Sequence, residues 1–239
     1  MKILGFSNPS RVANPLVANS DALSGATDMA TRGWTLEKPA AVAVATMTGT
    51  EFRSEPVRGG NALTGSLWAN TTTGYLYYKQ ITGYNVEMRA KIRTRNTADT
   101  STPSTSGTTR RLASIMAHDP NRASLNYTGA GLGMVLTTLA AEARNTINNV
   151  TTPSDGLAWP VDETGQQQAE IRLVRRQSIW SFGIRPVTGG DWVSITGDVD
   201  RSANPMPETL WWGLSVSANM LAHDIIGFFR DISFQKLYP

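Results

Sequence analysis

The sequence contains no cysteine and only two histidines, His118 and His223. The lack of cysteine excludes disulfides and metal sites built on thiolates. Charged residues make up only 17% of the 239 residues, against the ~25% usual in globular domains. The formal net charge of +3 is also too small to favour nucleic acid as a partner. The fold must therefore be stabilised by apolar packing, either within the chain or against partner chains.

Long hydrophobic runs are also lacking. The apolar stretch at residues 1–6 is too short for the central region of a signal peptide, and Asn8-Pro9 ends it. No stretch approaches the ~18 apolar residues of a membrane-spanning helix. We therefore expect no signal peptide, no transmembrane segment and no membrane partner, and a protein that stays soluble in the cytoplasm until it assembles.

Apolar and aromatic residues are well represented, at 40% hydrophobic with seven Trp, six Tyr and six Phe. The clearest strand spans residues 84–95, where Val86, Met88, Ala90 and Ile92 alternate with charged residues. A helical turn is predicted at residues 140–144, and irregular structure at 145–168. In the last strand, Phe228, Ile232 and Phe234 share one parity and are expected on one face. Further strands are predicted at residues 41–47, 74–81, 111–117, 131–138, 169–174, 178–185, 191–196, 211–218 and 225–237.

Short strands separated by turns, without a convincing long helix, predict an all-β fold, an antiparallel β-sandwich. A length of 239 residues suits one large sandwich. Residues 1–30 lack any period and contain turn signals such as Asn8-Pro9 and Asn14-Pro15. We therefore predict an extended N-terminal arm at residues 1–30 and a single sandwich domain at 31–239. Whether the arm lies on its own domain or on a neighbouring subunit stays open.

The order of the strand motifs carries a family resemblance. The motifs are Trp34, GYLYYKQITGYNVEMR at 74–89, AHDP at 117–120, EIRLVRR at 170–176, WSF at 180–182, DWVSI at 191–195, WGLSVS at 212–217 and GFFRDISF at 227–234. This succession resembles the concanavalin-A-like lectin/glucanase superfamily, which includes laminin-G-like modules. The resemblance implies a jelly roll of two curved antiparallel sheets, with a concave face that often holds glycans.

The opening of the chain resembles phage virion proteins, in which an arm rich in Asn and Ser leads into Gly-Trp-Thr. Here Asn19-Ser20-Asp21 precedes Gly33-Trp34-Thr35. This resemblance implies a non-enzymatic structural protein of a viral (phage) particle, made in the host cytoplasm and located in the virion. A capsid decoration or cement protein, or a tail or fibre component, is expected. Its partners would be other virion proteins and further copies of itself in a homo-oligomer.

Sequence motifs for catalysis and metal binding are lacking. Glucanases of this superfamily carry carboxylates as Glu-x-Asp-x-(x)-Glu on one strand face, and the sequence has no such pattern. Asp162 and Glu163 are adjacent and would point to opposite faces of a strand. Neither histidine lies beside a Gly-x-Ser-x-Gly elbow. Asp119 and Asn121 offer oxygen ligands to calcium, but an Asp-Pro-Asn turn is favoured. We therefore predict no catalytic residue, cofactor or metal, and glycoside hydrolysis is only a remote alternative.

The charged face of strand 84–95 is the first candidate site for docking. Its basic residues should repeat every ~6.6–6.8 Å along the strand, and Arg172 and Arg176 extend the basic character if their strand lies nearby. The face is either an ordinary solvated surface or a stripe that binds an acidic partner. The predicted docking residues, with two from the arm, are Arg89, Lys91, Arg93, Arg95, Phe6 and Arg11.

The tryptophans supply the second set of candidates. Trp34 and Trp212 are expected in the core. Trp211 and Trp212 are adjacent in a strand, so one of them must face away from the core. A lectin-like carbohydrate-binding module is therefore the alternative function. The candidate glycan or interface aromatics are Trp159, Trp180, Trp192 and Trp211.

Overall fold

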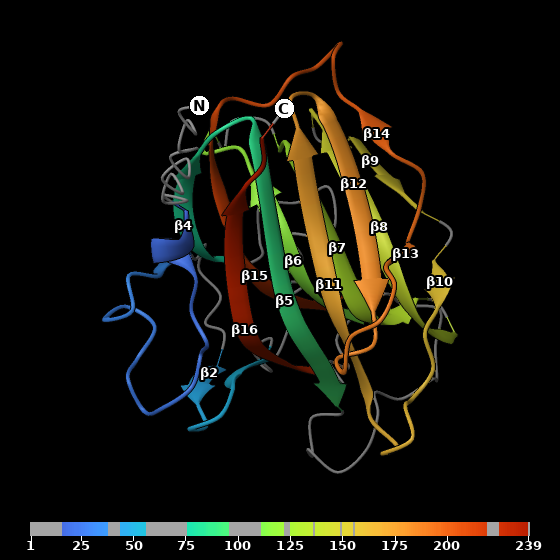
Figure 1. The fold of residues 1–239 in the computed structure, drawn as a ribbon. Coiled ribbons are helices and arrows are strands. Elements are labelled where there is room, and N and C mark those ends of the chain that lie inside the picture. The colour runs from blue at the N-terminus through green and yellow to red at the C-terminus, as the bar shows by residue number, and fades with distance from the viewer. Residues whose placement is uncertain are drawn as a thin grey trace, which may run out of the picture.

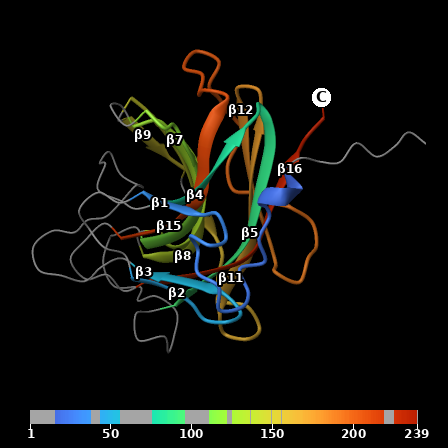
Figure 2. The same ribbon diagram turned by 90° about the vertical axis from the view of Figure 1, so that its left-hand side faces the viewer.

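A computed structural model describes residues 16–37, 44–55, 76–95, 111–121, 125–135, 137–148, 150–154, 156–218 and 225–238. Two eight-stranded sheets, antiparallel at every strand pair, pack face to face (Figure 2). This confirms the predicted antiparallel β-sandwich. Within the described part of the chain, the only helical element is the single turn η1 (Val17–Asn19). No helix in these residues has the length and apolarity needed to cross a lipid bilayer.

The first sheet contains the strands that lie behind in Figure 1. Its order is β1 (Thr35–Glu37), β4 (Leu76–Thr82), β15 (Thr209–Ala218), β6 (Arg111–His118), β7 (Tyr127–Val135), β8 (Thr138–Ile147) and β10 (Leu157–Ala158), with β9 (Val150–Pro153) also paired to β8.

The second sheet faces the viewer in Figure 1, where β16, β5, β11 and β12 lie side by side. Its order is β13 (Val193–Ser194), β12 (Ile179–Arg185), β11 (Gln167–Arg176), β5 (Asn85–Arg95), β16 (Ile226–Lys236), β3 (Phe52–Glu55) and β2 (Val44–Met47), with β14 (Val199–Asp200) also paired to β12.

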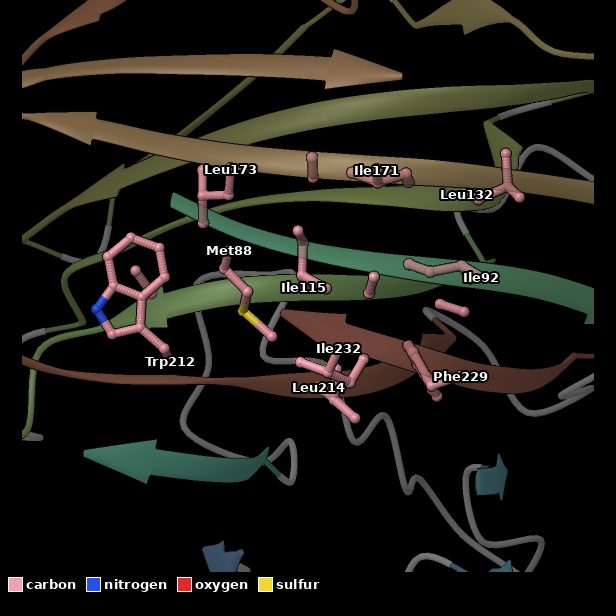
Figure 3. Packing of buried hydrophobic residues seen from close by; sticks show 14 of the residues in the cluster. Met88, Ile92, Ile115, Leu132, Ile171, Leu173, Trp212, Leu214, Phe229 and Ile232 are labelled. Atoms are coloured by element: carbon pink, nitrogen blue, oxygen red, sulfur yellow. The ribbon is translucent and has the colours of Figure 1, made fainter. Parts of the chain in front are cut away.

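The core lies between the sheets and is built from alternate residues of each strand. Met88 and Ile92 of β5 face Ile115 of β6 and Leu214 of β15 across this space (Figure 3). Trp212 is fully buried and lies tilted against Trp180, with ring centroids 5.6 Å apart. Trp34 is 3% exposed. The prediction that Trp34 and Trp212 belong to the core is confirmed.

A β-bulge in β16 corrects the predicted face of the last strand. The pairing register with β5 shifts between Arg230 and Ser233, and Asp231 has a φ of 52°. Because the bulge adds one residue, the inward parity changes there. Phe229 therefore lies in the core before the bulge, and Ile232 after it. Phe228, predicted to share a face with Ile232, instead lies under the guanidinium of Arg93, 3.8 Å from the ring centroid.

The predicted helical turn at 140–144 is wrong, and so is the irregular structure predicted for all of 145–168. Residues 140–144 belong to strand β8, and β9 and β10 follow within the second segment. The local sequence Leu-Ala-Ala-Glu-Ala has high helix propensity. Ala141 and Ala143 nevertheless pack into the sandwich core, and β8 pairs with β7 from Thr138 to Thr146. Tertiary packing therefore overrides the local preference.

The N-terminal segment packs on the domain from residue 16 onward. Leu23 and Met29 are buried. Asp21 and Ile232 exchange backbone hydrogen bonds of 2.8 and 2.7 Å. Described residues 16–30 thus contact their own domain. The candidates Phe6 and Arg11 lie outside the described residues, so the docking of the arm and the domain boundary at residue 30 stay predictions.

Candidate functional site

An open groove of about 530 Å³ lies where the loop after β10 faces the segment after β12. This volume falls within the ~300–1,000 Å³ typical of small-ligand sites. We call it the Trp159 groove. Its lining residues are Ala158, Trp159, Pro160, Val161, Asp162, Glu163, Gln168, Pro186, Val187 and Thr188.

Trp159 is held firmly in this groove. Its backbone N–H donates to the Leu139 carbonyl at 2.9 Å. Its indole Nε1–H donates to the Gln168 carbonyl at 3.0 Å. The partly buried ring also packs against the sandwich core. The groove therefore offers an aromatic ring whose orientation is fixed before any ligand arrives.

Asp162 closes the loop that forms one wall of the groove. Its carboxylate accepts hydrogen bonds from the Thr164 hydroxyl (2.6 Å), the Gln168 side-chain amide (2.5 Å) and the backbone N–H groups of Thr164 and Gln166. These hydrogen bonds, the Thr164 hydroxyl first, lower the pKa of Asp162 from 3.8 to about 2. Glu163 lines the same groove. A general acid needs a raised pKa, so Asp162 is suited to accepting hydrogen bonds rather than to protonating a leaving group.

The basic face predicted on β5 lies on the outer side of the second sheet, and its charges have partners within the chain. Arg89 pairs with Glu87. Nζ of Lys91 lies 2.9 Å from Oδ2 of Asp231, and Nη2 of Arg93 lies 2.6 Å from Oε2 of Glu51. Arg95 ends the strand and is half-buried. The alternation that defines this face is therefore present, while its role in docking stays a prediction.

Trp192 joins the basic face to the predicted aromatics. Strand β11 pairs with β5, which places Arg172 directly opposite Arg89. The guanidinium carbons of Arg89, Arg172 and Arg185 lie 5.5, 4.5 and 4.4 Å from the centroid of the Trp192 ring. We call these four residues the Trp192 cluster. The sequence predicted Trp192 and Arg89 as separate candidates, and the fold brings them together.

Trp211 lies on the outer face of the first sheet, opposite the core residue Trp212, as the alternation predicted. It stacks on Tyr78 with ring centroids 4.5 Å apart, and on His118 at 6.2 Å. His118 in turn stacks on Tyr127 at 6.0 Å. Trp211 therefore belongs to an aromatic row that crosses four strands.

Trp180 is the candidate that the structure contradicts. It is fully buried in the core, together with Phe182 and Ile184 of the same strand. All three residues have the same parity in β12, so the strand points all of them inward. The prediction of Trp180 as an exposed platform for a glycan or partner was wrong.

Two buried arginines near the sandwich rim escaped the sequence analysis. Arg175 donates to the carbonyls of Met206 and Pro207 at 2.8 and 2.7 Å. Arg201 donates to the side chain of Asn126 at 3.2 Å. Burial lowers the pKa of each guanidinium to about 10. Arg175 has the same parity as the core residues of β11, so the alternation in this strand could have predicted that Arg175 is buried.

Among the described residues, the remaining candidates do not gather into a group able to hold a metal. Asp119 accepts a hydrogen bond from the backbone N–H of Asn121 at 2.9 Å, which is the favoured Asp-Pro-Asn turn. His118 is buried, with Nδ1 2.6 Å from the Asp119 carbonyl oxygen. No group of three or more His, Asp or Glu residues able to hold a metal occurs in the described ranges. His223 lies outside them.

No protein-family model matches the chain, and no curated protein does. Solved structures share its fold. A protein of unknown function from Saccharomyces cerevisiae is 11% identical in sequence, with a TM-score of 0.59. The match covers 89% of this chain and 100% of the yeast protein's chain. A xylan β-1,4-xylosidase from Bacillus halodurans is 10% identical with a TM-score of 0.58, covering 99% of this chain. The chain spans only 41% of that xylosidase.

A structure solved with a bound glycan is similar as well. The exoplasmic/lumenal domain of VIP36, in its Ca²⁺/Man3GlcNAc-bound form, is 9% identical with a TM-score of 0.56 and covers 93% of this chain and 90% of its own. At these identities the likeness concerns the fold alone. The similarities agree with the β-sandwich fold that the sequence predicted.

Proposed function

We propose that the chain is a non-catalytic carbohydrate-binding module and that the Trp159 groove is its binding site. The observation that supports this most is the groove itself, in which a fixed indole ring, carboxylates and an amide line one open space. Sites of this kind combine an apolar ring with a few polar groups that fix orientation. The VIP36 domain, solved with Man3GlcNAc, adds a fold-level analogy.

The groove suits a sugar because its parts are ordered in advance. Trp159 is held by two hydrogen bonds, so binding a ligand costs little side-chain entropy. Glu163 adds a carboxylate that accepts hydrogen bonds from sugar hydroxyls, and Pro160 and Pro186 add rigid apolar surface. The Asp162 carboxylate is ionised at neutral pH and is held by hydrogen bonds from its own loop, so it forms part of this ordered surface.

The test is a glycan array followed by calorimetry with the strongest hit. Trp159→Ala should weaken binding at least tenfold, because it removes the ring that lines the groove. Trp211→Ala is the matched control, since it removes an indole from the outer face of the other sheet and should change affinity less than twofold. Circular dichroism checks that both variants fold. An array without hits, or equal losses in the two variants, would contradict the proposal.

A structural role in a viral particle is the second candidate. It is supported by the resemblance of the opening residues to phage virion proteins and by the row of arginines on the outer face of β5. In this role the chain is a decoration, cement, tail or fibre protein that docks through its arm and that face, as a homo-oligomer. Light scattering and co-sedimentation with particles lacking the protein test it. A monodisperse monomer that does not bind such particles would rule it out.

A further inference from the structure

The Trp159 groove and the Trp192 cluster both include residues of strand β11. Gln168, at the groove, is followed on the same face of β11 by Glu170 and then Arg172. At strand rise, four residues span about 13 Å. An oligosaccharide covers this distance, whereas a single sugar does not.

Gly183 makes room for the centre of this cluster. It lies opposite Arg172 in the β11–β12 pairing. A Cβ atom at position 183 would lie 2.6 Å from Nε of Arg172 and 3.2 Å from Cε3 of Trp192. The guanidinium and the indole therefore both lie directly over the backbone of β12, in space that any side chain there would occupy.

Arg172 differs from the other two arginines of the cluster in its partners. Arg89 pairs with Glu87, and Arg185 pairs with Glu170 at 2.7 Å. No hydrogen bond or ion pair joins Arg172 to another residue in the described ranges, and its buried Nε–H has no acceptor there. Leaving a buried donor unpaired is costly.

The charges around Arg172 are mostly of its own sign. Burial, together with the positive charges of Arg89, Arg185 and Arg176, lowers its pKa, while Glu87 acts in the opposite direction. A guanidinium is a planar fork that binds carboxylate or sulfate oxygens through two parallel hydrogen bonds. An anion beside this guanidinium would offset the repulsion among the arginines.

We propose that Arg172, beside Trp192, binds the oxyanion of an acidic sugar. The anion is a uronic acid carboxylate or a sugar sulfate on the same glycan of which another sugar ring occupies the Trp159 groove. This inference rests on the proposed carbohydrate-binding function and specifies its ligand class as an acidic oligosaccharide.

Calorimetry with four probes tests it: tetragalacturonate, its full methyl ester, a sulfated neutral tetrasaccharide and polyglutamate. Arg172→Met keeps a long side chain but removes the charge, and should weaken tetragalacturonate binding at least tenfold without affecting the ester. Gly183→Ala keeps the arginine but displaces it, and should reproduce this loss. Arg230→Met is the charge-matched control on the same outer face, on β16 rather than β11, and should change affinity less than twofold. Thermal melts verify that each variant is folded.

The outcomes separate this inference from the proposed function. Equal affinity for acid and ester, with both lost in Trp159→Ala, overturns the acidic-sugar site and leaves the carbohydrate-binding function standing. Failure of wild-type protein to bind any glycan overturns both. Polyglutamate binding as tight as that of the acidic glycans identifies an acidic protein surface as the partner and overturns the inference. A preference for tetragalacturonate or for the sulfated probe, lost in Arg172→Met, supports it and names the anion.

Discussion

The two sheets carry the same short motif in opposite surroundings. Glu87 and Arg89 on β5 form an ion pair on the outer face of the second sheet. Glu142 and Arg144 on β8 form the equivalent pair on the first sheet. The arginine side chain is 31% exposed in the first case and 9% in the second. Identical Glu-x-Arg spacing thus gives one pair that reaches water and one that does not.

The difference follows from what each sheet buries. The second sheet packs one face on the core and presents charges on the other. Strands β6 and β7 of the first sheet are buried on both faces, since Leu112, Met116 and Tyr127 form a second apolar cluster on the side away from the core. Polar groups on the outer face of the first sheet therefore need hydrogen-bond partners within the protein. Polar groups on the outer face of the second sheet can instead be hydrated or can bind a ligand.

The largest expected effect comes from breaking the buried pair. Glu142→Gln removes a carboxylate that is fully buried beside Arg144. Because the arginine charge would remain with little access to water, the free energy of unfolding should fall by about 3–5 kcal/mol. Urea denaturation measures it. Glu87→Gln is the matched control and should cost about 1 kcal/mol or less, because Arg89 can be hydrated. Equal losses would mean that the two faces are not energetically different.

A second prediction compares apolar truncations on the two sheets. Leu112→Ala empties a fully buried position in the second apolar cluster of the first sheet, and should lower the free energy of unfolding by about 2–5 kcal/mol. Val193→Ala, in β13 of the second sheet, truncates a side chain that is 46% exposed and should cost about 0.5 kcal/mol or less. A small effect for Leu112→Ala would show that the first sheet does not need its second apolar face.

The smallest expected effect concerns acid and the loop of the Trp159 groove. The pKa of Asp162 is depressed in the folded state, to about 2. Its stabilising contribution is therefore complete above pH 3.8 and is lost as the pH falls through about 2. NMR titration should give this low pKa, with Trp159 signals shifting in the same range. Asp162→Asn should remove that transition, and an ordinary pKa for Asp162 would contradict the hydrogen-bonded loop.

Regular alternation made much of the fold predictable. The apolar positions of β5 identified its core face and its charged face, and the adjacent pair Trp211 and Trp212 divided between the two faces as expected. The bulge at Asp231 was not predictable from the sequence. The extra residue is defined by the register of β16 against β5, and the sequence of β16 alone does not contain that register. The parity of Trp180 with Phe182 was visible in the sequence and would have assigned it to the core.

The candidate site was less predictable because it joins separate segments. The Trp159 groove needs the loop after β10 beside the segment after β12, and only the tertiary fold brings them together. The Trp192 cluster needs Arg172 beside Arg89 and Trp192 lying over Gly183. The sequence identified Arg89, Trp159 and Trp192 as candidates, but it did not show which other residues the fold places beside them.

The bulge in β16 also has a consequence for the order in which the chain folds. At the bulge, the N–H groups of Asp231 and Ile232 donate to the carbonyls of Ala22 and Asp21, and the N–H of Phe234 donates to the hydroxyl of Ser20. Residues 20–22 are thus held by β16, which follows them by more than 200 positions: Ser20 and Phe234 are 214 residues apart. During synthesis these hydrogen bonds cannot form until β16 has left the ribosome, so the segment docks late although it precedes β1 in the chain.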